Sequence, residues 1–362
     1  MVDHGAPLAG HGEACLPVNQ LKAERVAMCM TFKLPPAADG TIVVGRSMEF
    51  PMGMPTKLAV LPSRHAGTAT LGSGHHNPHT WTATNGIVGM AVFGNEAWLV
   101  DGVNTAGVSA HVLFMGAGYC VYRDPKGDGS DISELDLVAF LLGTCATVEE
   151  IKVAAASVNV IGLDPGMGFV PPTHFLFHDK TGSIAIEFHP DGTVISDNPV
   201  SVATNAPYLD WHLINLGNYM GASPQNPPAK TIGALTIEPS GQGEALRSLP
   251  SDYSPASRFV RLFNFIQLAD RAADATGAEQ VALHILNAFD IPTGLITETM
   301  GGKVVPEVTV WDAVVNLSDL RYAYRPISNP ATYVVDLHTV DFSAPARSID
   351  LEWNGAFTPI SI

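Results

Sequence analysis

Two short apolar runs lie close together in the first part of the chain, and a turn signal separates them. Residues 28–32 (Met-Cys-Met-Thr-Phe) form one run and residues 41–44 (Thr-Ile-Val-Val) form the other. The dipeptide Asp39-Gly40 between them is typical of a tight turn. We therefore predict two strands paired as a hairpin, which carries Arg46 back beside Cys29.

The next region has the pattern of several strands. Residues 57–63 and 80–114 contain short apolar segments separated by turn residues. Asn85-Gly86 separates the segments 81–84 and 87–92, and Asn-Gly in this position is the strongest short signal for a hairpin. We therefore predict that these two segments pair directly with each other.

Helical patterns follow, each with a recognisable start. Ser130 is predicted to cap the first helix, and Thr147 opens a capping box before the second. Ser254-Pro255 supplies an N-cap followed by proline at the first helical position. The predicted helices cover 135–142, 148–157, a segment beginning at 255, and 278–289.

Further strands lie between and after these helices. Residues 179–182 and 189–192 are turn sequences between apolar segments, which is typical of hairpins. The predicted strands are 174–177, 183–188, 193–195, 200–204, 308–315, 322–324 and 333–335. The order of strands, helices, strands, helices and strands, with short connections, predicts an α+β fold in which helices cover antiparallel sheets.

One long segment does not fit either periodicity. Residues 219–250 are rich in Pro, Gly, Ser and Asn. A stretch of this length without regular structure is uncommon inside a compact domain. We interpret it as an excursion from the fold that serves as a subunit-contact arm.

Composition and charge narrow the classes of function. Of the 362 residues, 46% are hydrophobic and 15% are charged, which is typical of a chain with a sizeable core in one large or two ordinary domains. The formal net charge of -16 argues against nucleic acid and anionic membranes as partners. No apolar run in the sequence has the length needed to span a bilayer.

Cysteine and histidine positions do not indicate a metal centre. The four cysteines match no zinc pattern and are too few for a disulfide scaffold. His75, His76 and His79 lie in a Gly/Pro-rich loop, but no carboxylate or cysteine accompanies them locally. We favour a solvated loop beside a substrate cleft over a metal site.

The first 28 residues are distinct from the rest. They carry charged side chains throughout and lack the apolar segment of a secretory signal peptide, so we expect a cytoplasmic protein. This segment is a propeptide removed before Cys29, a misassigned start with translation beginning at Met28, or a short tail. We therefore divide the chain into an extension, 1–28, and a domain, 29–362.

Cys29 is the candidate nucleophile. If the chain is cut before it, the residue gains a free α-amine, whose pKa near about 8 suits proton transfer at neutral pH. The reactive form of a thiol is the thiolate, and a guanidinium such as that of Arg46 favours it. The alternative is that Cys29 is a small apolar residue buried in a strand.

Motifs along most of the chain agree in order with one known family. They are Cys29, 45–49 (Gly-Arg-Ser-Met-Glu), 101–104 (Asp-Gly-Val-Asn), 203–207 (Ala-Thr-Asn-Ala-Pro), and 254–261 (Ser-Pro-Ala-Ser-Arg-Phe-Val-Arg). Each motif is weak alone, but together they make the chain similar to the choloylglycine hydrolases, which include bile salt hydrolases and penicillin V acylases. The resemblance extends from Cys29 to about Tyr324.

The resemblance implies roles for six residues. Cys29 corresponds to the catalytic cysteine, which is the first residue of the mature chain, and Arg46 to the arginine near its sulfur. Glu49 stands where the family usually has an aspartate that orients the α-amine. Asn205 corresponds to the asparagine whose amide donates to the oxyanion, and Arg258 to an arginine close to the site. The sixth is Phe114, whose backbone N–H occupies the position of the second oxyanion donor.

The resemblance also implies the architecture and the reaction. The family belongs to the N-terminal nucleophile (Ntn) hydrolases, with a four-layer αββα sandwich of two antiparallel sheets, and its members are often homotetramers. The reaction is hydrolysis of a linear amide C–N bond in a small N-acyl substrate, without cofactor or metal. Conjugated bile acids, penicillin V and N-acyl homoserine lactones are all possible substrates.

Two alternatives to this reaction remain. The chain could be a non-catalytic ligand-binding member of the fold in which Cys29 is internal and blocked. It could also be a cysteine hydrolase with a histidine base, although none of the 13 histidines lies in a recognisable Cys/His setting. The N-terminal sequence of the purified protein distinguishes the first alternative from the enzyme.

Overall fold

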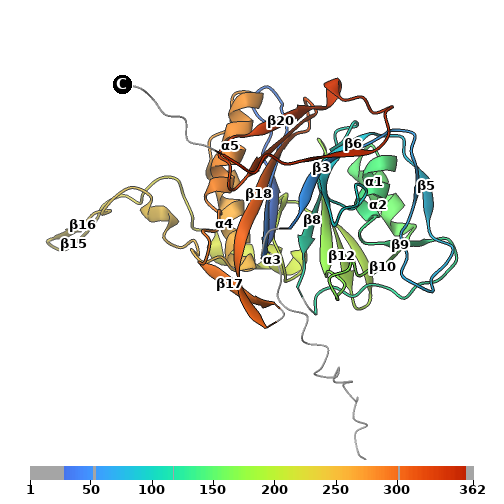
Figure 1. The fold of residues 1–362 in the computed structure, drawn as a ribbon. Coiled ribbons are helices and arrows are strands. Elements are labelled where there is room, and N and C mark those ends of the chain that lie inside the picture. The colour runs from blue at the N-terminus through green and yellow to red at the C-terminus, as the bar shows by residue number, and fades with distance from the viewer. Residues whose placement is uncertain (1–27, 52–53, 117, 301, 356–362) are drawn as a thin grey trace, which may run out of the picture.

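The structure is a computed structural model that describes residues 28–51, 54–116, 118–300 and 302–355 (Figure 1). Apart from Met28, the predicted N-terminal extension lies outside the described residues, as does Cys15. No helix in the described part of the chain is long and apolar enough to cross a membrane.

Two large antiparallel sheets form the centre of the molecule. In the first sheet the strand order is β14-β1-β2-β18-β19-β20, with β17 paired to β18, and in the second it is β13-β12-β11-β8-β7-β6-β3-β21. The strands of the first sheet are β1 (Cys29–Lys33), β2 (Val43–Pro51), β14 (Val202–Ala203), β17 (Ile296–Met300), β18 (Lys303–Asn316), β19 (Arg321–Pro326) and β20 (Tyr333–Asp336). Those of the second are β3 (Thr56–Leu61), β6 (Ile87–Val92), β7 (Leu99–Asn104), β8 (Ser109–Phe114), β11 (Thr173–His178), β12 (Ser183–His189), β13 (Gly192–Asp197) and β21 (Arg347–Asp350).

Helices cover the outer face of each sheet. Helices α4 (Pro255–Leu268) and α5 (Ala275–Asn287) pack on the first sheet, and α1 (Leu137–Thr144) and α2 (Val148–Ala156) pack on the second. Figure 1 shows these layers side by side, with the two sheets between the helix pairs. The α+β fold with four αββα layers is therefore confirmed.

The alternation of side chains along the strands separates the two parts of the core. In β11, Leu176 belongs to the cluster that includes residues of the first sheet, whereas Phe175 and Phe177 pack with α1 and α2. Successive side chains in a strand point to opposite faces. A strand that is buried on both faces is therefore apolar on both, as Phe175, Leu176 and Phe177 are at the centre of β11.

The predicted hairpin at the start of the chain is present. Strands β1 and β2 pair antiparallel, with Thr31 opposite Arg46 and Cys29 opposite Met48. Gly40 has φ +90°, which glycine adopts without strain, and the Asp39 carboxylate accepts the Thr41 N–H at 2.9 Å. The turn signal at Asp39-Gly40 therefore predicted the pairing of these two strands correctly.

The hairpin predicted at Asn85-Gly86 is wrong. Strand β5 (Thr80–Thr82) pairs with β4 (Ala66–Thr68), and β6 pairs with β3 and β7. The Asn85 side chain instead donates to the carbonyls of Leu142 and Cys145, at 3.2 and 2.8 Å. The dipeptide therefore satisfies carbonyls at the end of α1, and it does not form a two-residue turn.

Two smaller predictions are also corrected. Ser130 does not cap a helix, because strand β9 (Asp131–Ser133) follows it and α1 has Asp136 at its N-cap. The predicted strand 200–204 is reduced to β14 (Val202–Ala203), which pairs with β1 in the first sheet. By contrast, Thr147 caps α2 and Ser254 caps α4 as predicted, each accepting a backbone N–H.

The segment 219–250 leaves the body of the molecule. It contains the hairpin of β15 (Lys230–Ile232) and β16 (Leu235–Ile237), which extends away from the sheets in Figure 1. The remaining short elements are β10 (Asn159–Ile161), parallel to β9, and the 3-10 helices at Leu216–Tyr219, Glu244–Leu246 and Leu337–Thr339.

Candidate active site

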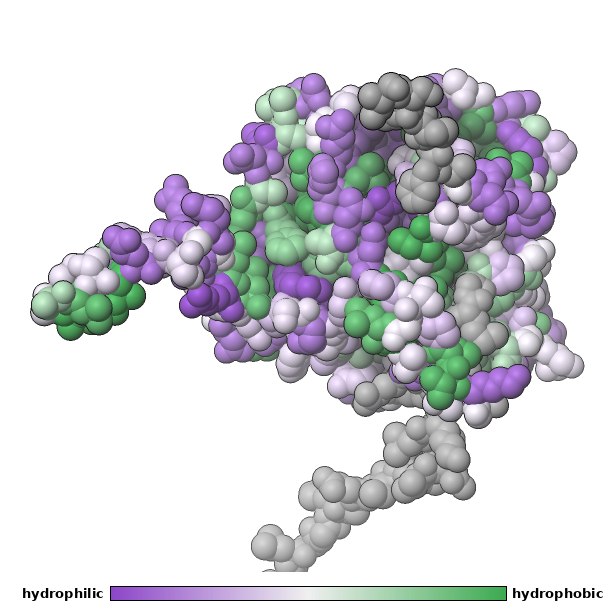
Figure 2. All heavy atoms as spheres, turned by 60° about the vertical axis from the view of Figure 1, so that its left-hand side comes forward, coloured by the Kyte–Doolittle hydropathy of each residue, from purple (hydrophilic) through white to green (hydrophobic). Residues whose placement is uncertain are grey.

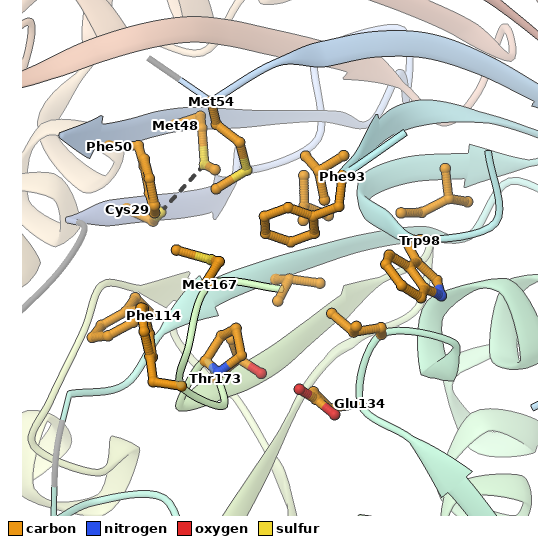
Figure 3. Close-up of a pocket in the computed structure, with 17 residues that line it drawn as sticks. Cys29, Met48, Phe50, Met54, Phe93, Trp98, Phe114, Glu134, Met167 and Thr173 are labelled. Atoms are coloured by element: carbon orange, nitrogen blue, oxygen red, sulfur yellow. Dashed lines mark hydrogen bonds between the residues drawn. The ribbon is translucent and has the colours of Figure 1, made fainter. Parts of the chain in front are cut away.

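Cys29 is the first residue of β1, and it lies between the two sheets. Only 2% of the residue is exposed, and Sγ lies 3.7 Å from Sδ of Met48 on the neighbouring strand (Figure 3). Burial raises the pKa of the Cys29 thiol, and the positive charge of Arg46 opposes this rise. In the chain that continues to Met28, the thiol is therefore protonated near neutral pH.

Arg46 lies in β2 and is fully buried beside the sulfur. Its Nη2 is 4.0 Å from Sγ of Cys29 and donates to the carbonyl of Val112 at 2.7 Å. The guanidinium also lies over the indole ring of Trp311, 4.6 Å from the centroid. These contacts fix the positive charge next to the thiol, as the sequence predicted.

A buried carboxylate that the sequence analysis assigned no role holds Arg46 from the second sheet. Asp101 Oδ2 lies 3.2 Å from Arg46 Nε and 2.6 Å from His111 Nδ1, and Oδ1 accepts the Tyr322 hydroxyl at 2.6 Å. Arg46 and Asp101 are both inaccessible to solvent. Asp101 belongs to the motif at 101–104, but Arg46 and Tyr322 are distant from it in sequence, so only the folded structure identifies these two partners.

Asn205 follows β14, and its side chain bonds to the backbones of Cys29 and Phe114. Its Oδ1 accepts the backbone N–H of Cys29 at 3.2 Å, and its Nδ2 donates to the carbonyl of Phe114 at 2.6 Å. A primary amide carries a second N–H on the same nitrogen. Asn205 is thus adjacent to the cysteine and retains a donor that can face a substrate.

Arg258 and Phe114 complete the surroundings of the cysteine. Arg258, on α4, donates to the carbonyl of Cys29 at 2.9 Å and to Oδ1 of Asn205. Phe114, at the end of β8, lines the cavity beside Cys29, and a backbone hydrogen bond from it lowers the pKa of the Cys29 thiol. Arg46, Asn205, Arg258 and Phe114 therefore all lie around Cys29.

Glu49 is buried near the cysteine, but the Cys29 N–H donates to Asn205, and Oε2 of Glu49 has no hydrogen-bond partner among the described residues. Burial raises the pKa of Glu49 to about 8, although the charge of Arg258 opposes this. Its backbone N–H donates to the carbonyl of Met28 at 3.0 Å, and the Met28 N–H donates to Oε1 of Glu307 at 2.7 Å. The peptide that joins Met28 to Cys29 is thus held in place on both sides.

A second set of buried polar groups supports the segment that carries Asn205. His212 Nε2 lies 2.9 Å from the Asn205 carbonyl, and His174 Nε2 lies 2.9 Å from the Thr204 carbonyl. Glu187 Oε1 accepts the N–H of Leu209, the first residue of α3 (Leu209–Asn215). Burial lowers the pKa of His212 to about 4, so this histidine is neutral near pH 7.

An apolar cavity opens beside Cys29 (Figure 3). Its walls come from β2, β8 and the loops that contain Phe93, Trp98 and Met167. The lining side chains are mostly aromatic and aliphatic, which is typical of a site for an apolar ligand. An apolar group held in this cavity would lie beside Cys29.

The predicted histidine loop does not form part of this cavity. His79 packs edge-on against Phe140, and His75 and His76 are exposed. Within the described ranges, no group of three or more His, Cys, Asp or Glu side chains could hold a metal ion.

The sequence matches the model of one protein family over residues 34–350, which is most of the chain. This model is described as the linear amide C-N hydrolases, choloylglycine hydrolase family. The chain belongs to the choloylglycine hydrolase family. It is accordingly an amidohydrolase that acts on linear amides, and the resemblance drawn from its motifs is confirmed. The match begins at residue 34 and does not include Cys29. The case for Cys29 as a site residue therefore depends on the contacts described above.

Individual proteins and a solved structure are similar to this chain. An uncharacterized protein of Paramecium bursaria Chlorella virus 1 is 28% identical over 80% of this chain and 94% of its own length. A bile salt hydrolase/transferase from Lactiplantibacillus plantarum is 31% identical over 61% of this chain and 68% of its own. A solved structure of a variant of conjugated bile acid hydrolase from Clostridium perfringens has the same fold, with a TM-score of 0.80 at 22% identity, over 92% of this chain and 100% of that chain.

Proposed function

We propose that this choloylglycine hydrolase cleaves an N-acyl amide with Cys29 as the nucleophile, after the bond between Met28 and Cys29 has been cut. The observation that carries the proposal is the convergence of Arg46, Asn205 and Arg258 on Cys29 beside an apolar cavity. These residues come from distant parts of the chain, and each contacts the cysteine directly.

The cut changes the chemistry of Cys29. The backbone nitrogen becomes an α-amine, which can accept the proton of the thiol on the same residue. The Asn205 Oδ1 that now accepts the Cys29 N–H at 3.2 Å would hold this amine. Arg46 would stabilise the thiolate, which offsets part of the cost of burial. We assign Glu49, a buried acid that acts on the thiol electrostatically, to orienting the amine.

The reaction then proceeds in two halves. The thiolate attacks the carbonyl carbon of the amide, and the Asn205 amide and the Phe114 N–H donate hydrogen bonds to the oxyanion. The α-ammonium returns the proton to the leaving nitrogen, so that the C–N bond breaks and a thioester remains. Water, deprotonated by the α-amine, attacks the thioester, the C–S bond breaks, and the acid leaves.

The cavity would hold the acyl group. Its apolar lining suits a long or ring-containing acyl chain, such as those of conjugated bile acids, penicillin V or N-acyl homoserine lactones. The Lactiplantibacillus relative is named as a bile salt hydrolase/transferase. A panel of these three classes is therefore the first set of substrates to test.

Intact-mass analysis combined with this panel tests the proposal. We expect the active protein to begin at Cys29, and Cys29→Ser to lose most hydrolysis, since a hydroxyl is a much poorer nucleophile near neutral pH. Thermal unfolding of the variant would control for folding. Unchanged turnover by Cys29→Ser would remove the residue from the reaction.

The alternative is a binding protein in which Cys29 stays internal. The bonds that hold Met28 on both sides would fit that state. Binding of acyl amides without turnover, by a chain that retains Met28, would favour it. Turnover by a chain that begins at Cys29 would exclude it.

A further inference from the structure

A buried carboxyl lies in the wall of the cavity, across from Cys29 (Figure 3). Glu134 follows strand β9, and only 3% of the residue is exposed. Its Oε2 accepts the N–H of Leu163 at 2.9 Å, whereas Oε1 has no hydrogen-bond partner among the described residues. A buried polar atom without a partner is costly, so a ligand that supplies one is favoured.

Among the other polar side chains of the described lining, the indole N–H of Trp98 also lacks a hydrogen-bond partner. The hydroxyl of Thr173 bonds to the Tyr122 hydroxyl at 2.8 Å, and Cys29 is the proposed nucleophile. Beside Glu134 the wall is formed by apolar side chains such as Leu135 and Leu99. Oε1 of Glu134 and Nε1 of Trp98 are thus free hydrogen-bonding atoms in a lining that is otherwise mostly apolar, and of the two only Oε1 can accept a hydrogen bond.

The protonation of Glu134 indicates which ligand group it suits. Burial raises the pKa of Glu134 to about 8. The titratable groups that act on it include Asp136, Cys120 and Tyr122, and none of these three is a cation. Near neutral pH the carboxyl is therefore largely neutral, and because Oε2 already accepts a hydrogen bond, the proton belongs on Oε1.

We propose that Glu134 is a specificity residue that selects acyl groups carrying a hydroxyl at the end remote from the amide. A hydroxyl can accept a bond from the neutral carboxyl and donate one to the ionised carboxyl, so it serves both states. An ammonium group would lack a counter-charge when the carboxyl is neutral. This inference rests on the proposed function, because that function assigns the cavity to the acyl group.

Matched pairs of substrates test the inference. N-acylglycines of increasing chain length are compared with their terminally hydroxylated counterparts, and kcat/KM is measured for each pair. At the chain length that reaches Glu134, we expect the hydroxyl to raise kcat/KM by about tenfold. If neither series is hydrolysed, the result counts against the proposed function. If both series are hydrolysed equally well, only the role of Glu134 is overturned.

Variants of two lining residues separate this role from a structural one. Glu134→Gln retains the acceptor for Leu163 and a donor at the other position, so the preference should persist. Glu134→Leu should abolish the preference while it still hydrolyses the plain acyl chains, and thermal unfolding reports whether it is folded. Thr173→Val is the control, and its preference should match that of the wild type. If Glu134→Leu retains the preference, or if terminal ammonium groups are preferred to hydroxyls, the proposal is wrong.

Discussion

Asn205 connects the cysteine, Arg258 and the end of β8 through one side chain. In the proposed reaction its amide stabilises the oxyanion, and a donor of this kind is worth about 3–4 kcal/mol of transition-state energy. We therefore expect Asn205→Ala to lower kcat by about 100-fold or more.

Steady-state kinetics on an acyl amide, with circular dichroism to verify folding, would measure the effect of Asn205→Ala. Asn205→Asp is an informative control, because it keeps the acceptor for the Cys29 nitrogen but lacks the amide donor. A loss smaller than twofold in the alanine variant would show that Asn205 acts only in the turn before Pro207.

The buried carboxyl of Glu134 makes a second prediction at the scale of one residue. Its pKa is raised from 4.5 to about 8 in the folded protein, so the folded state holds a proton that the unfolded chain has lost. Its contribution to stability is complete below pH of about 4 and is lost as the pH rises toward about 8. Relative to Glu134→Gln, the wild type should lose on the order of a few kcal/mol of unfolding free energy between pH 5 and about 8.

Urea denaturation of both proteins at several pH values would measure this difference for Glu134. Because the glutamine variant differs only in the titratable group, the titrations of the other residues cancel. A difference in unfolding free energy that is independent of pH would mean that Glu134 ionises normally.

Between elements, the network around Asp101 joins the two sheets. Asp101 and His111 lie in β7 and β8 of the second sheet, and Arg46 and Tyr322 lie in β2 and β19 of the first. Removing one partner of a buried ion pair leaves an uncompensated charge, which costs about 3–5 kcal/mol. We expect Asp101→Asn to destabilise the fold by about this amount and to lower activity as Arg46 moves.

Chemical denaturation would measure the change caused by Asp101→Asn. The matched control is Asp350→Asn, which removes the carboxylate of an exposed ion pair with Lys57, where the side chains are 84% and 50% accessible. Exposed pairs contribute little, so this control should be nearly neutral. Equal effects of the two substitutions would contradict the role assigned to Asp101.

The distance along the chain between contacting residues explains what the sequence could and could not predict. The β1–β2 hairpin and the cap of α2 depend on neighbouring residues, so Asp39-Gly40 and Thr147 were sufficient to predict them. Asn85-Gly86 misled because its amide bonds to carbonyls near residue 142, more than fifty residues away. The partners of Asp101 and the free Oε1 of Glu134 likewise depend on contacts between distant segments, which periodicity does not encode.

At the scale of the whole molecule, the hairpin of β15 and β16 stands apart from the body. Ile232, Leu235 and Ile237 are 58%, 62% and 50% exposed, and Figure 2 shows hydrophobic residues gathered at the free end of this arm. Isolated two-stranded hairpins are marginal in water, and exposed apolar groups of this kind mark contact sites. We therefore keep the prediction that this arm joins subunits, in a tetramer.

Replacing Ile232 and Leu235 by serine should lower the molar mass in solution from that of a tetramer to that of a smaller species. Light scattering coupled to size-exclusion chromatography would measure it. Thr236→Ser, on the same hairpin, is the control and should leave the mass unchanged. A wild-type protein that is monomeric at micromolar concentration would refute the role of the arm.

The position of Phe114 has a consequence for how this protein could diverge. Its main chain bonds to Asn205 and lies beside the sulfur, while its ring forms part of the cavity wall. In the proposed reaction residue 114 takes part only through its peptide group. Substitution of Phe114 can therefore change the shape of the cavity without removing either oxyanion donor. Related proteins could in this way acquire a preference for another acyl group while the groups that carry out the reaction are retained.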